Sequence, residues 1–243
     1  MCGRFTLKAS AKDFVAAFGC PPADDNALPL FNIAPSQDVT VVRESGTTHV
    51  RQAVRMRWGL VPSWADDLSV GNRTINARAE TVSTKPTFRH SFRQKRCLIA
   101  ADGFYEWRKV GKLKQPYFIS LNDQQLFAFA GLWDRWERSG EPIETCTIIT
   151  TDANEMLRAL HDRMPVILPR ENYSAWLDPA NEDVEQLSSL LKPLPASQMQ
   201  AWPVSTLVNA PANDLPQCTE RVAELPAEEI APKSSSKQRQ LFD

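Results

Sequence analysis

A cysteine stands in the second position of the chain, within Met1-Cys2-Gly3-Arg4. Removal of Met1, which a small second residue permits, would leave a cysteine whose free α-amine sits beside its thiol. That amine has an ordinary pKa of about 8 and is partly neutral at pH 7, and the thiol is a strong nucleophile once ionised. An amine and an adjacent thiol can together convert an aldehyde into a five-membered thiazolidine ring. The start of the chain therefore predicts covalent capture of an aldehyde carbon, with a terminal cysteine that has no role as the alternative.

The segment Ile75-Asn76-Ala77-Arg78-Ala79-Glu80 brings an amide, a guanidinium and a carboxylate close together in the sequence. If the segment is extended, these three side chains share one face. Such a face would present donors to a sugar and a phosphate. A solvated edge strand is the alternative.

Glu106 follows an apolar run and lies between two aromatic residues, in Phe104-Tyr105-Glu106-Trp107. A carboxylate in apolar surroundings has a raised pKa and suits proton transfer. The alternative is a glutamate at a strand end that faces water.

His161 is one of three histidines and lies between an expected helix and an expected strand, beside Asp162 and Arg163. A histidine in such a loop is suited to acid–base chemistry near pH 7. The other two, His49 and His90, are expected to be structural or solvated. Because the three are dispersed, we expect no catalytic metal.

Two tryptophans, Trp58 and Trp64, flank the sequence Gly59-Leu60-Val61-Pro62. Tryptophans in loops can stack on unpaired bases, with a contribution of roughly 1–3 kcal/mol per base. We expect Trp58 to pack in the core and Trp64 to be available for stacking.

The elements that must position these residues are mostly strands. Helix signals include Ser10, which can cap a helix that Gly19 ends. Strands dominate the middle and do not alternate regularly with helices, which favours an α+β fold with a curved, mostly antiparallel sheet and peripheral helices. Expected helices cover 10–19, 86–94, 154–160, 171–177 and 182–191, and expected strands cover 38–44, 48–57, 96–107, 116–121, 126–132, 145–151, 164–168 and 199–204, with turns at 45–46 and 109–114.

The 243 residues, of which 42% are apolar, suffice for one domain with a full core. We expect that domain over residues 1–225 and a flexible tail over 226–243, where the composition becomes polar. No apolar run is long enough to span a membrane, and no secretory signal is evident. Five scattered cysteines without a CxxC pair favour neither a disulfide framework nor a zinc site, so a reduced, cytoplasmic protein is expected.

Charge is distributed unevenly along the chain. Residues 1–110 contain 16 lysines and arginines, 11 of them arginines, against 10 acidic residues, although the whole chain has a net charge of -1. Arginine is well suited to phosphate. This distribution favours a nucleic-acid surface in the first half, with an ordinary solvated surface as the alternative.

Six segments, taken together and in order, resemble the SRAP (SOS-response-associated peptidase) family of abasic-site processing proteins. The segments are Met1–Phe5, Asn32–Pro35, Trp58–Trp64, Ile75–Glu80, Ala101–Trp107 and His161–Pro165. The resemblance covers residues 1 to about 210. One difference is Ala65, at a position where we associate the family with a second stacking tryptophan.

This resemblance implies a single α+β domain with a β-barrel-like core and a positively charged DNA groove. It implies that Cys2 forms a thiazolidine crosslink with the aldehyde of an abasic site in single-stranded DNA, which shields the lesion at low turnover. Asn76 would orient the Cys2 amine or the sugar, Glu106 would move protons, and His161 would be a general acid/base. Self-removal of Met1 fits the peptidase label, and lyase activity is a further possibility.

The resemblance also implies a DNA path. Arg4, Arg78 and Arg163 would hold phosphates, and Asn32 and Trp64 would line the path. We expect no cofactor and no membrane partner, and a monomer that acts in the cytoplasm at damaged or replicating DNA of the nucleoid.

The sequence Gln238-Arg239-Gln240-Leu241-Phe242 is similar to the peptide that binds the bacterial sliding clamp, and it follows a polar tether. A chance pentapeptide is the alternative. Two other functions stay open for the whole chain. One is an N-terminal-nucleophile cysteine hydrolase of the amidotransferase type, and the other is a non-covalent reader of single-stranded or modified DNA.

Overall fold

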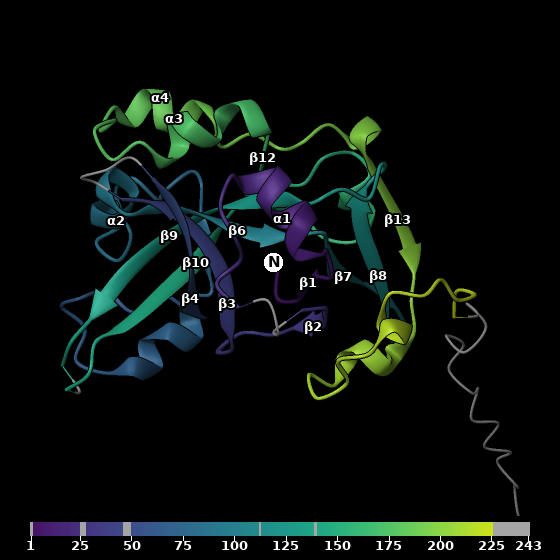
Figure 1. Cartoon of the computed structure of the whole chain (residues 1–243). Coiled ribbons are helices and arrows are strands. Elements are labelled where there is room, and N and C mark those ends of the chain that lie inside the picture. Colours follow the sequence, from purple (N-terminus) through teal and green to yellow (C-terminus); the bar gives the residue numbers. More distant parts are fainter. Residues whose placement is uncertain (1, 25–27, 46–49, 112, 139, 226–243) are drawn as a thin grey trace, which may run out of the picture.

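Five strands of the computed structural model pair into a closed ring, β4-β3-β6-β9-β10, in which β10 returns to pair with β4. The β10–β4 pairing is parallel and the other four are antiparallel, so the expected curved, mostly antiparallel, barrel-like sheet is confirmed (Figure 1). The structure describes residues 2–24, 28–45, 50–111, 113–138 and 140–225. The ring strands are β3 (Asp38–Glu44), β4 (Arg51–Trp58), β6 (Arg96–Ala101), β9 (Phe127–Trp136) and β10 (Ile143–Asp152).

Three short strands extend the ring. Both β5 (Asn76–Arg78) and β11 (Arg163–Pro165) pair with β10, and β12 (Ile167–Leu168) pairs with β9. The strand expected over 164–168 is thus two strands with Val166 between them. Glu80 lies in a turn beyond β5, so the expected shared extended face does not include it.

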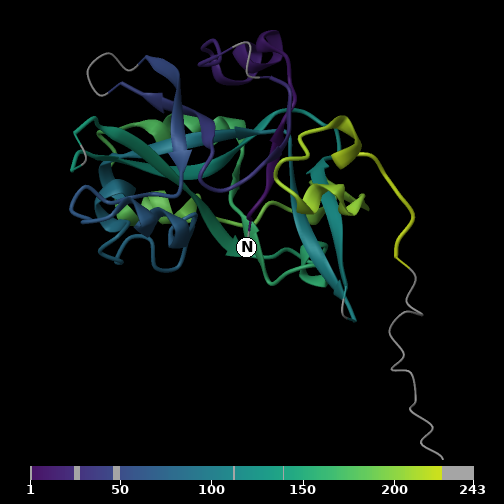
Figure 2. The same cartoon turned by 90° about the horizontal axis from the view of Figure 1, so that it is seen from below.

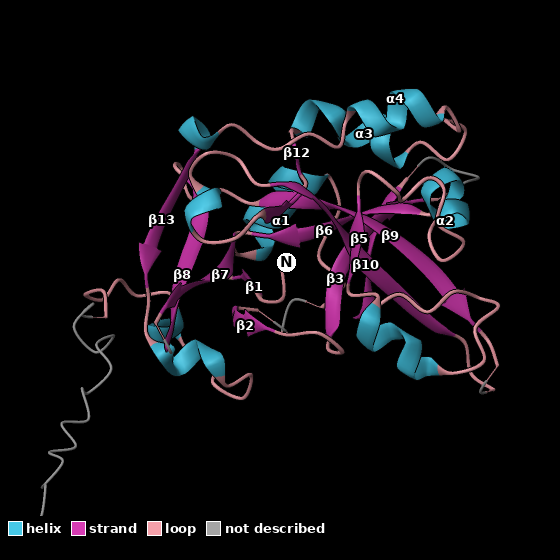
Figure 3. Ribbon diagram, turned by 180° about the vertical axis from the view of Figure 1, so that it is seen from behind, coloured by secondary structure: helices cyan, strands magenta, loops and turns pink. Residues whose placement is uncertain are grey.

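A second, fully antiparallel sheet lies beside the barrel (Figures 2 and 3). Its order is β13 (Met199–Pro203), β8 (Leu113–Leu121), β7 (Gly103–Val110), β1 (Phe5–Leu7) and β2 (Leu30–Ile33). The expected turn around Gly111 joins β7 to β8, where Val110 pairs with Leu113 and Gly111 has φ 58°.

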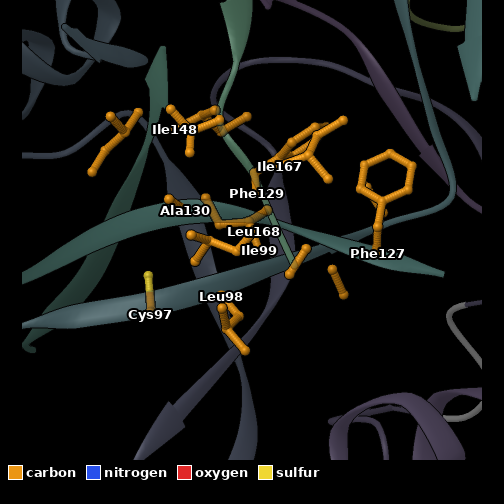
Figure 4. Close-up of a cluster of buried hydrophobic side chains, with 14 of the residues drawn as sticks. Cys97, Leu98, Ile99, Phe127, Phe129, Ala130, Ile148, Ile167 and Leu168 are labelled. Atoms are coloured by element: carbon orange, nitrogen blue, oxygen red, sulfur yellow. The ribbon is translucent and has the colours of Figure 1, made fainter. Parts of the chain in front are cut away.

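Buried apolar side chains pack on both faces of the barrel strands (Figure 4). Phe5 of β1 joins this core, with its ring centroid 5.2 Å from that of Trp58 and 5.7 Å from that of Phe129. Such aromatic pairs contribute about 0.5–1.5 kcal/mol beyond burial. The core therefore anchors β1, and with it the start of the chain. Side chains labelled in Figure 4 come from β6 (Cys97, Leu98, Ile99), β9 (Phe127, Phe129, Ala130), β10 (Ile148) and β12 (Ile167, Leu168).

The helices lie at the periphery, as expected (Figure 1). Ser10 caps α1 by accepting from the Asp13 N–H, and Gly19 ends it with φ 74°. The helices are α1 (Ala11–Phe18), α2 (Arg89–Gln94), α3 (Tyr173–Leu177) and α4 (Val184–Ser189), with 3-10 segments over Leu68–Arg73, Leu157–Ala159, Arg170–Asn172, Ala196–Gln198, Thr206–Asn209 and Pro216–Cys218. The helix expected over 154–160 is wrong, because only one 3-10 turn, Leu157–Ala159, forms before His161. The buried Asn154 side chain accepts from the Leu157 N–H and donates to the Leu194 carbonyl.

The single strand expected over 96–107 is also wrong, because Asp102 divides it into β6 of the barrel and β7 of the second sheet. The Asp102 carboxylate accepts from the backbone N–H groups of Lys8 and Ala9 and from the Thr6 hydroxyl. A Cβ at Gly103 would lie 2.1 Å from the Phe118 ring, so the corner also requires glycine there.

None of the helices in the described part of the chain has the length and apolar character needed to span a lipid bilayer. The same residues contain no group of three or more potential metal ligands. All five cysteines are free and buried. The expected turn at 45–46 lies partly outside the described residues, and the tail over 226–243 lies wholly outside them.

Candidate active site

Cys2 is fully buried just before β1. The β1–β7 ladder pairs Phe5 with Phe104, and the Tyr105 N–H donates to the Arg4 carbonyl at 3.0 Å. In this register, the segment that precedes Phe5 lies alongside Glu106. Burial, followed by the charge of Glu106, holds the pKa of the Cys2 thiol well above its ordinary value. At neutral pH the thiol is therefore protonated, with a carboxylate nearby that can accept its proton.

Asn76 reaches Cys2 from the barrel side. Strand β5 pairs in parallel with β10, with Asn76 opposite Ile148. The Asn76 side-chain Nδ2 donates to the Cys2 carbonyl at 2.8 Å. Its Oδ1 is buried and has no hydrogen-bond partner among the described residues. The amide thus holds the backbone of Cys2 and keeps an acceptor for one further donor.

Glu106 is 3% exposed. Burial, with a further contribution from the charge of Asp162, raises the pKa of Glu106 to about 7. The expected burial is confirmed, and burial acts on the pKa of Glu106 in the expected direction. A carboxyl with this pKa is present in both protonation states at neutral pH, which suits it to move protons in either direction.

His161 lies between the 3-10 turn Leu157–Ala159 and β11. Its Nδ1 lies 3.0 Å from the backbone nitrogen of Arg163, which donates, and 2.7 Å from an Asp162 carboxylate oxygen. Burial lowers the pKa of His161 in spite of Asp162. The lowered pKa favours the neutral ring, and its Nδ1 faces both the Arg163 N–H and the Asp162 carboxylate.

The structure thus gathers side chains from four distant segments. Cys2 is hydrogen-bonded to Asn76, and the charge of Glu106 raises the pKa of its thiol. In turn, the charge of Asp162, which adjoins His161, raises the pKa of Glu106. A cavity of about 530 Å³ at the other end of β1, lined in part by Lys8, shares no residue with this cluster.

Two residues expected along a DNA path, Arg4 and Asn32, contact the C-terminal segment. Arg4 donates to Asn32 Oδ1 at 2.7 Å and to the Val208 carbonyl at 2.6 Å. Asn32 is 2% exposed, and its Nδ2 donates to the carbonyls of Ala210 and Asn213. Asn32 therefore lies in the interior, between β2 and the segment that follows β13.

The two tryptophans lie as expected. Trp64 is 58% exposed, whereas Trp58 is 1% exposed and donates from its indole to the Ile75 carbonyl at 2.9 Å. Ala65 is buried, and its carbonyl accepts from the Trp136 indole at 2.7 Å. A side chain at position 65 thus faces the interior of this loop.

The two remaining arginines differ in their surroundings. Arg78 is exposed. The Arg163 guanidinium is 10% exposed and forms ion pairs with Glu80 and Asp152. Sequence reasoning named Glu80 but not its pairing with Arg163, and it missed the contacts of Arg4 with the C-terminal segment. Neither contact could be predicted from neighbouring residues, because Arg163 and Glu80 are 83 residues apart and Arg4 and Val208 are 204 residues apart.

Comparison with known proteins adds an independent finding. The model of the SOS response associated peptidase (SRAP) family matches residues 1–211. The abasic site processing protein YoqW of Bacillus subtilis (strain 168) is 46% identical over 224 residues, which cover 90% of this chain and 99% of that protein. The abasic site processing protein HMCES of Gallus gallus is 37% identical over 221 residues, covering 81% of this chain and 65% of that protein. A crystal structure of a Bacteroides thetaiotaomicron protein, 29% identical, matches with a TM-score of 0.81 over 91% of this chain and 100% of that chain.

Proposed function

The chain belongs to the SOS response associated peptidase (SRAP) family, and on this premise we propose that it processes abasic sites in DNA. The similar proteins YoqW and HMCES are named abasic site processing proteins. The observation that carries the proposal is that buried Cys2 is hydrogen-bonded by the Asn76 amide and interacts electrostatically with the Glu106 carboxyl. We propose that Cys2, once Met1 is removed, captures the ring-opened sugar aldehyde of an abasic site in single-stranded DNA.

The chemistry needs both nucleophiles of the terminal cysteine. The α-amine of Cys2 adds to the aldehyde carbon, and loss of one water gives an imine. The thiol sulfur then adds to the imine carbon, and the thiol proton ends on nitrogen. One water leaves overall, and the aldehyde is consumed in a thiazolidine ring. This protects the strand, because a free aldehyde promotes elimination of its 3′ phosphate.

The proton transfers are assigned to Glu106 and His161. With a pKa of about 7, Glu106 can take the proton of the ammonium or thiol and return one to the departing hydroxyl. The neutral His161 ring would act as the general acid/base on the sugar oxygen as the ring opens. The Asn76 Oδ1 supplies an acceptor for the Cys2 amine or for a sugar hydroxyl.

The DNA would reach this cluster as a single strand. The exposed Trp64 is placed to stack on an unpaired base, and the exposed Arg78 to bind a phosphate. Arg4 is held by Asn32 and Val208, so its contribution would come from fixing the chain next to Cys2. We propose that the protein acts as a monomer on DNA of the nucleoid.

Removal of Met1 by the protein itself would account for the peptidase label of the family. The same site would then perform one cleavage of its own chain and later capture the aldehyde. A lyase step at the captured sugar is a compatible further activity. In each case turnover would be low, because Cys2 becomes part of the product.

The rival functions predict different behaviour. An amidotransferase-type hydrolase would use Cys2 as an acyl nucleophile and release ammonia from glutamine. A non-covalent DNA reader would bind reversibly, and its binding would survive Cys2→Ala. The family assignment and the carboxyl of raised pKa beside Cys2 support the abasic-site proposal over both.

The testing experiment incubates the protein with single-stranded DNA that carries one abasic site, followed by a denaturing gel. We expect a covalent band with the unaltered protein, none with Cys2→Ala, and an unchanged band with Cys97→Ala, which removes another buried cysteine. A band that persists in Cys2→Ala would refute the thiazolidine and indicate a lysine imine.

We further propose, from sequence alone, that Gln238–Phe242 binds the replication sliding clamp. This pentapeptide lies outside the described residues. Its two apolar residues would fill a pocket while the polar tether provides reach. Such an attachment would deliver the active site to replicating DNA.

A further inference from the structure

We propose that Asn154 is a positioning residue that fixes His161 relative to Glu106. Its buried side chain joins the loop that carries His161 to the segment that leads into the second sheet. The kinetic part of this inference rests on the function proposed above, in which both His161 and Glu106 move protons.

The two residues that would move protons come from different sheets. Glu106 lies on β7 of the second sheet, whereas His161 lies in the loop 153–162, which connects β10 to β11 of the barrel. Functional side chains on a loop depend on a rigid scaffold that holds the loop. A fixed distance between these two side chains therefore requires a contact that ties the loop to the second sheet.

Backbone hydrogen bonds close the loop on itself. The Ala153 N–H donates to the Asp162 carbonyl at 3.0 Å, next to the pairing of β10 with β11. The N–H groups of Leu160 and His161 both donate to the Leu157 carbonyl at 2.8 Å. The backbone position of His161 therefore depends on that of Leu157, which begins the 3-10 turn of the loop.

Asn154 holds this turn from inside the protein. Its side-chain Oδ1 accepts from the Leu157 N–H at 3.0 Å, and its backbone carbonyl accepts from the Arg158 N–H at 3.0 Å. The Leu157 side chain is itself buried. Loss of the Asn154 oxygen would take this acceptor from a buried N–H, and leaving a buried donor unsatisfied is costly. The amide thus fixes the residue to which the backbone of His161 is hydrogen-bonded.

The nitrogen of the same amide reaches the second sheet. Asn154 Nδ2 donates to the Leu194 carbonyl at 2.8 Å and to Met199 Sδ at 3.3 Å. Met199 opens β13, which pairs with β8, and β8 pairs with β7. Leu194 stands between Pro193 and Pro195, whose rings restrict the backbone on both sides of it, so its carbonyl is a rigid anchor. One side chain thus links the turn of the loop to the second sheet.

These contacts use both ends of the asparagine amide, which offers an acceptor oxygen and a donor nitrogen on one short side chain. A serine at position 154 would keep an acceptor for the Leu157 N–H, as serine does at the starts of helices. It would lack the nitrogen that donates to Leu194. Asn154→Ser therefore removes the link to the second sheet and retains the support of the turn, whereas Asn154→Ala removes both.

The test measures single-turnover crosslinking by Asn154→Ser and Asn154→Ala in the full chain, at saturating abasic single-stranded DNA. We expect both variants to slow crosslinking about ten- to a hundredfold, as misplacement of a reacting group does. In a His161→Ala background the same substitutions should slow it by less than about twofold, because two residues that act through one group are not additive. Equal slowing with and without His161 would overturn the inference, and so would an unaltered rate in Asn154→Ser.

Asn122→Ala is the matched control. The Asn122 amide donates to the Ser197 carbonyl, which lies on the same segment between α4 and β13 as Leu194, but Asn122 belongs to the turn between β8 and β9. This variant should crosslink at the unaltered rate. Asn154→Ser keeps the acceptor of the turn and should fold even if Asn154→Ala does not, and melting temperatures verify this.

A second readout needs no reaction. Amide hydrogen exchange reports the local opening of the loop. In Asn154→Ser the N–H groups of Leu160 and His161 should exchange at least about tenfold faster relative to the amides of β6, because a buried hydrogen bond that holds the loop is lost. Asn122→Ala should leave these ratios unchanged. Equal acceleration at all amides in Asn154→Ser, or none at Leu160 and His161, would overturn the inference, even if the unaltered protein formed no crosslink and the proposed function itself had failed.

Discussion

The side-chain amide of Asn76 donates to the backbone carbonyl of Cys2 at 2.8 Å, across 74 positions of sequence. This one contact joins the barrel strand β5 to the residue that precedes the second sheet. It holds the reactive residue by its backbone, which leaves the Cys2 amine and thiol for chemistry. The geometry is therefore suited to a nucleophile that uses both of its groups.

Asn76→Ala should slow crosslinking about tenfold or more, because loss of a buried hydrogen bond costs about 1–3 kcal/mol and 1.4 kcal/mol is a factor of ten. Asn76→Asp should be slow as well, since it sets a carboxylate oxygen against the Cys2 carbonyl. Single-turnover rates on abasic DNA measure both effects. Asn122→Ala, which removes an amide donor to the Ser197 carbonyl at an exposed site, is the matched control and should react normally. Equal rates in the Asn76 and Asn122 variants would contradict this role.

As the pH rises, ionisation of Glu106 should lower the stability of the fold and raise the rate of crosslinking. The pKa of Glu106 is raised from 4.5 to about 7 by burial, so the folded state binds its proton more tightly than the unfolded state. Ionisation of Glu106 therefore lowers the free energy of unfolding as the pH rises from about 4.5 to 7. Above pH 7 the full loss is on the order of 3 kcal/mol. Glu106→Gln should raise the melting temperature at pH 8 but not at pH 4. Crosslinking by the unaltered protein should rise through pH 7, and the variant should lack this inflection.

Glu220→Gln is the control for that experiment, because Glu220 is exposed. Its melting temperature should follow the unaltered protein at every pH. If Glu106→Gln melted at the same temperature as the unaltered protein at pH 8, the charge of the buried carboxylate would not destabilise the fold, which would contradict the prediction.

The two tryptophans of one loop should respond differently to truncation. Trp64→Ala should weaken binding of single-stranded DNA by about 1–3 kcal/mol and leave the melting temperature unchanged, because the side chain is 58% exposed. Trp58→Ala should instead reduce stability by about 3–5 kcal/mol, because Trp58 packs against Phe5 in the core. Fluorescence anisotropy and chemical denaturation measure the two effects. Full affinity in Trp64→Ala would remove this residue from the DNA path.

The terminal pentapeptide should bind a bacterial sliding clamp on its own. A synthetic peptide of the last dozen residues should bind purified clamp, and the Leu241→Ala/Phe242→Ala peptide should not, because its apolar anchors are lost. Isothermal titration calorimetry decides this. No binding at high micromolar concentration of the unaltered peptide would end the hypothesis.

Local signals in the sequence predicted local structure well. The Ser10 cap and Gly19 bounded α1, and the strand expected over 38–44 is β3 itself. The raised pKa of Glu106 was also predictable, because its apolar neighbours adjoin it in the sequence. These features depend on residues a few positions apart.

What the sequence did not predict depends on distant partners. Asp102 divides an apparently continuous strand because its carboxylate accepts from the chain around Lys8, more than 90 residues away. The ion pair between Arg163 and Glu80 was likewise not predictable, because the two residues are 83 positions apart.

We propose that Cys2 acts through its amine and its thiol together. The most direct measurement is mass spectrometry of the crosslink after nuclease and trypsin digestion and treatment with iodoacetamide. We expect an N-terminal peptide Cys2–Arg4 without Met1, heavier by the sugar remnant less one water, with a sulfur that resists alkylation. The Cys2→Ser protein should bind the same DNA but yield an adduct only when borohydride traps its imine. A remnant on a lysine, or a Cys2 sulfur that remains open to alkylation in the adduct, would contradict the claim.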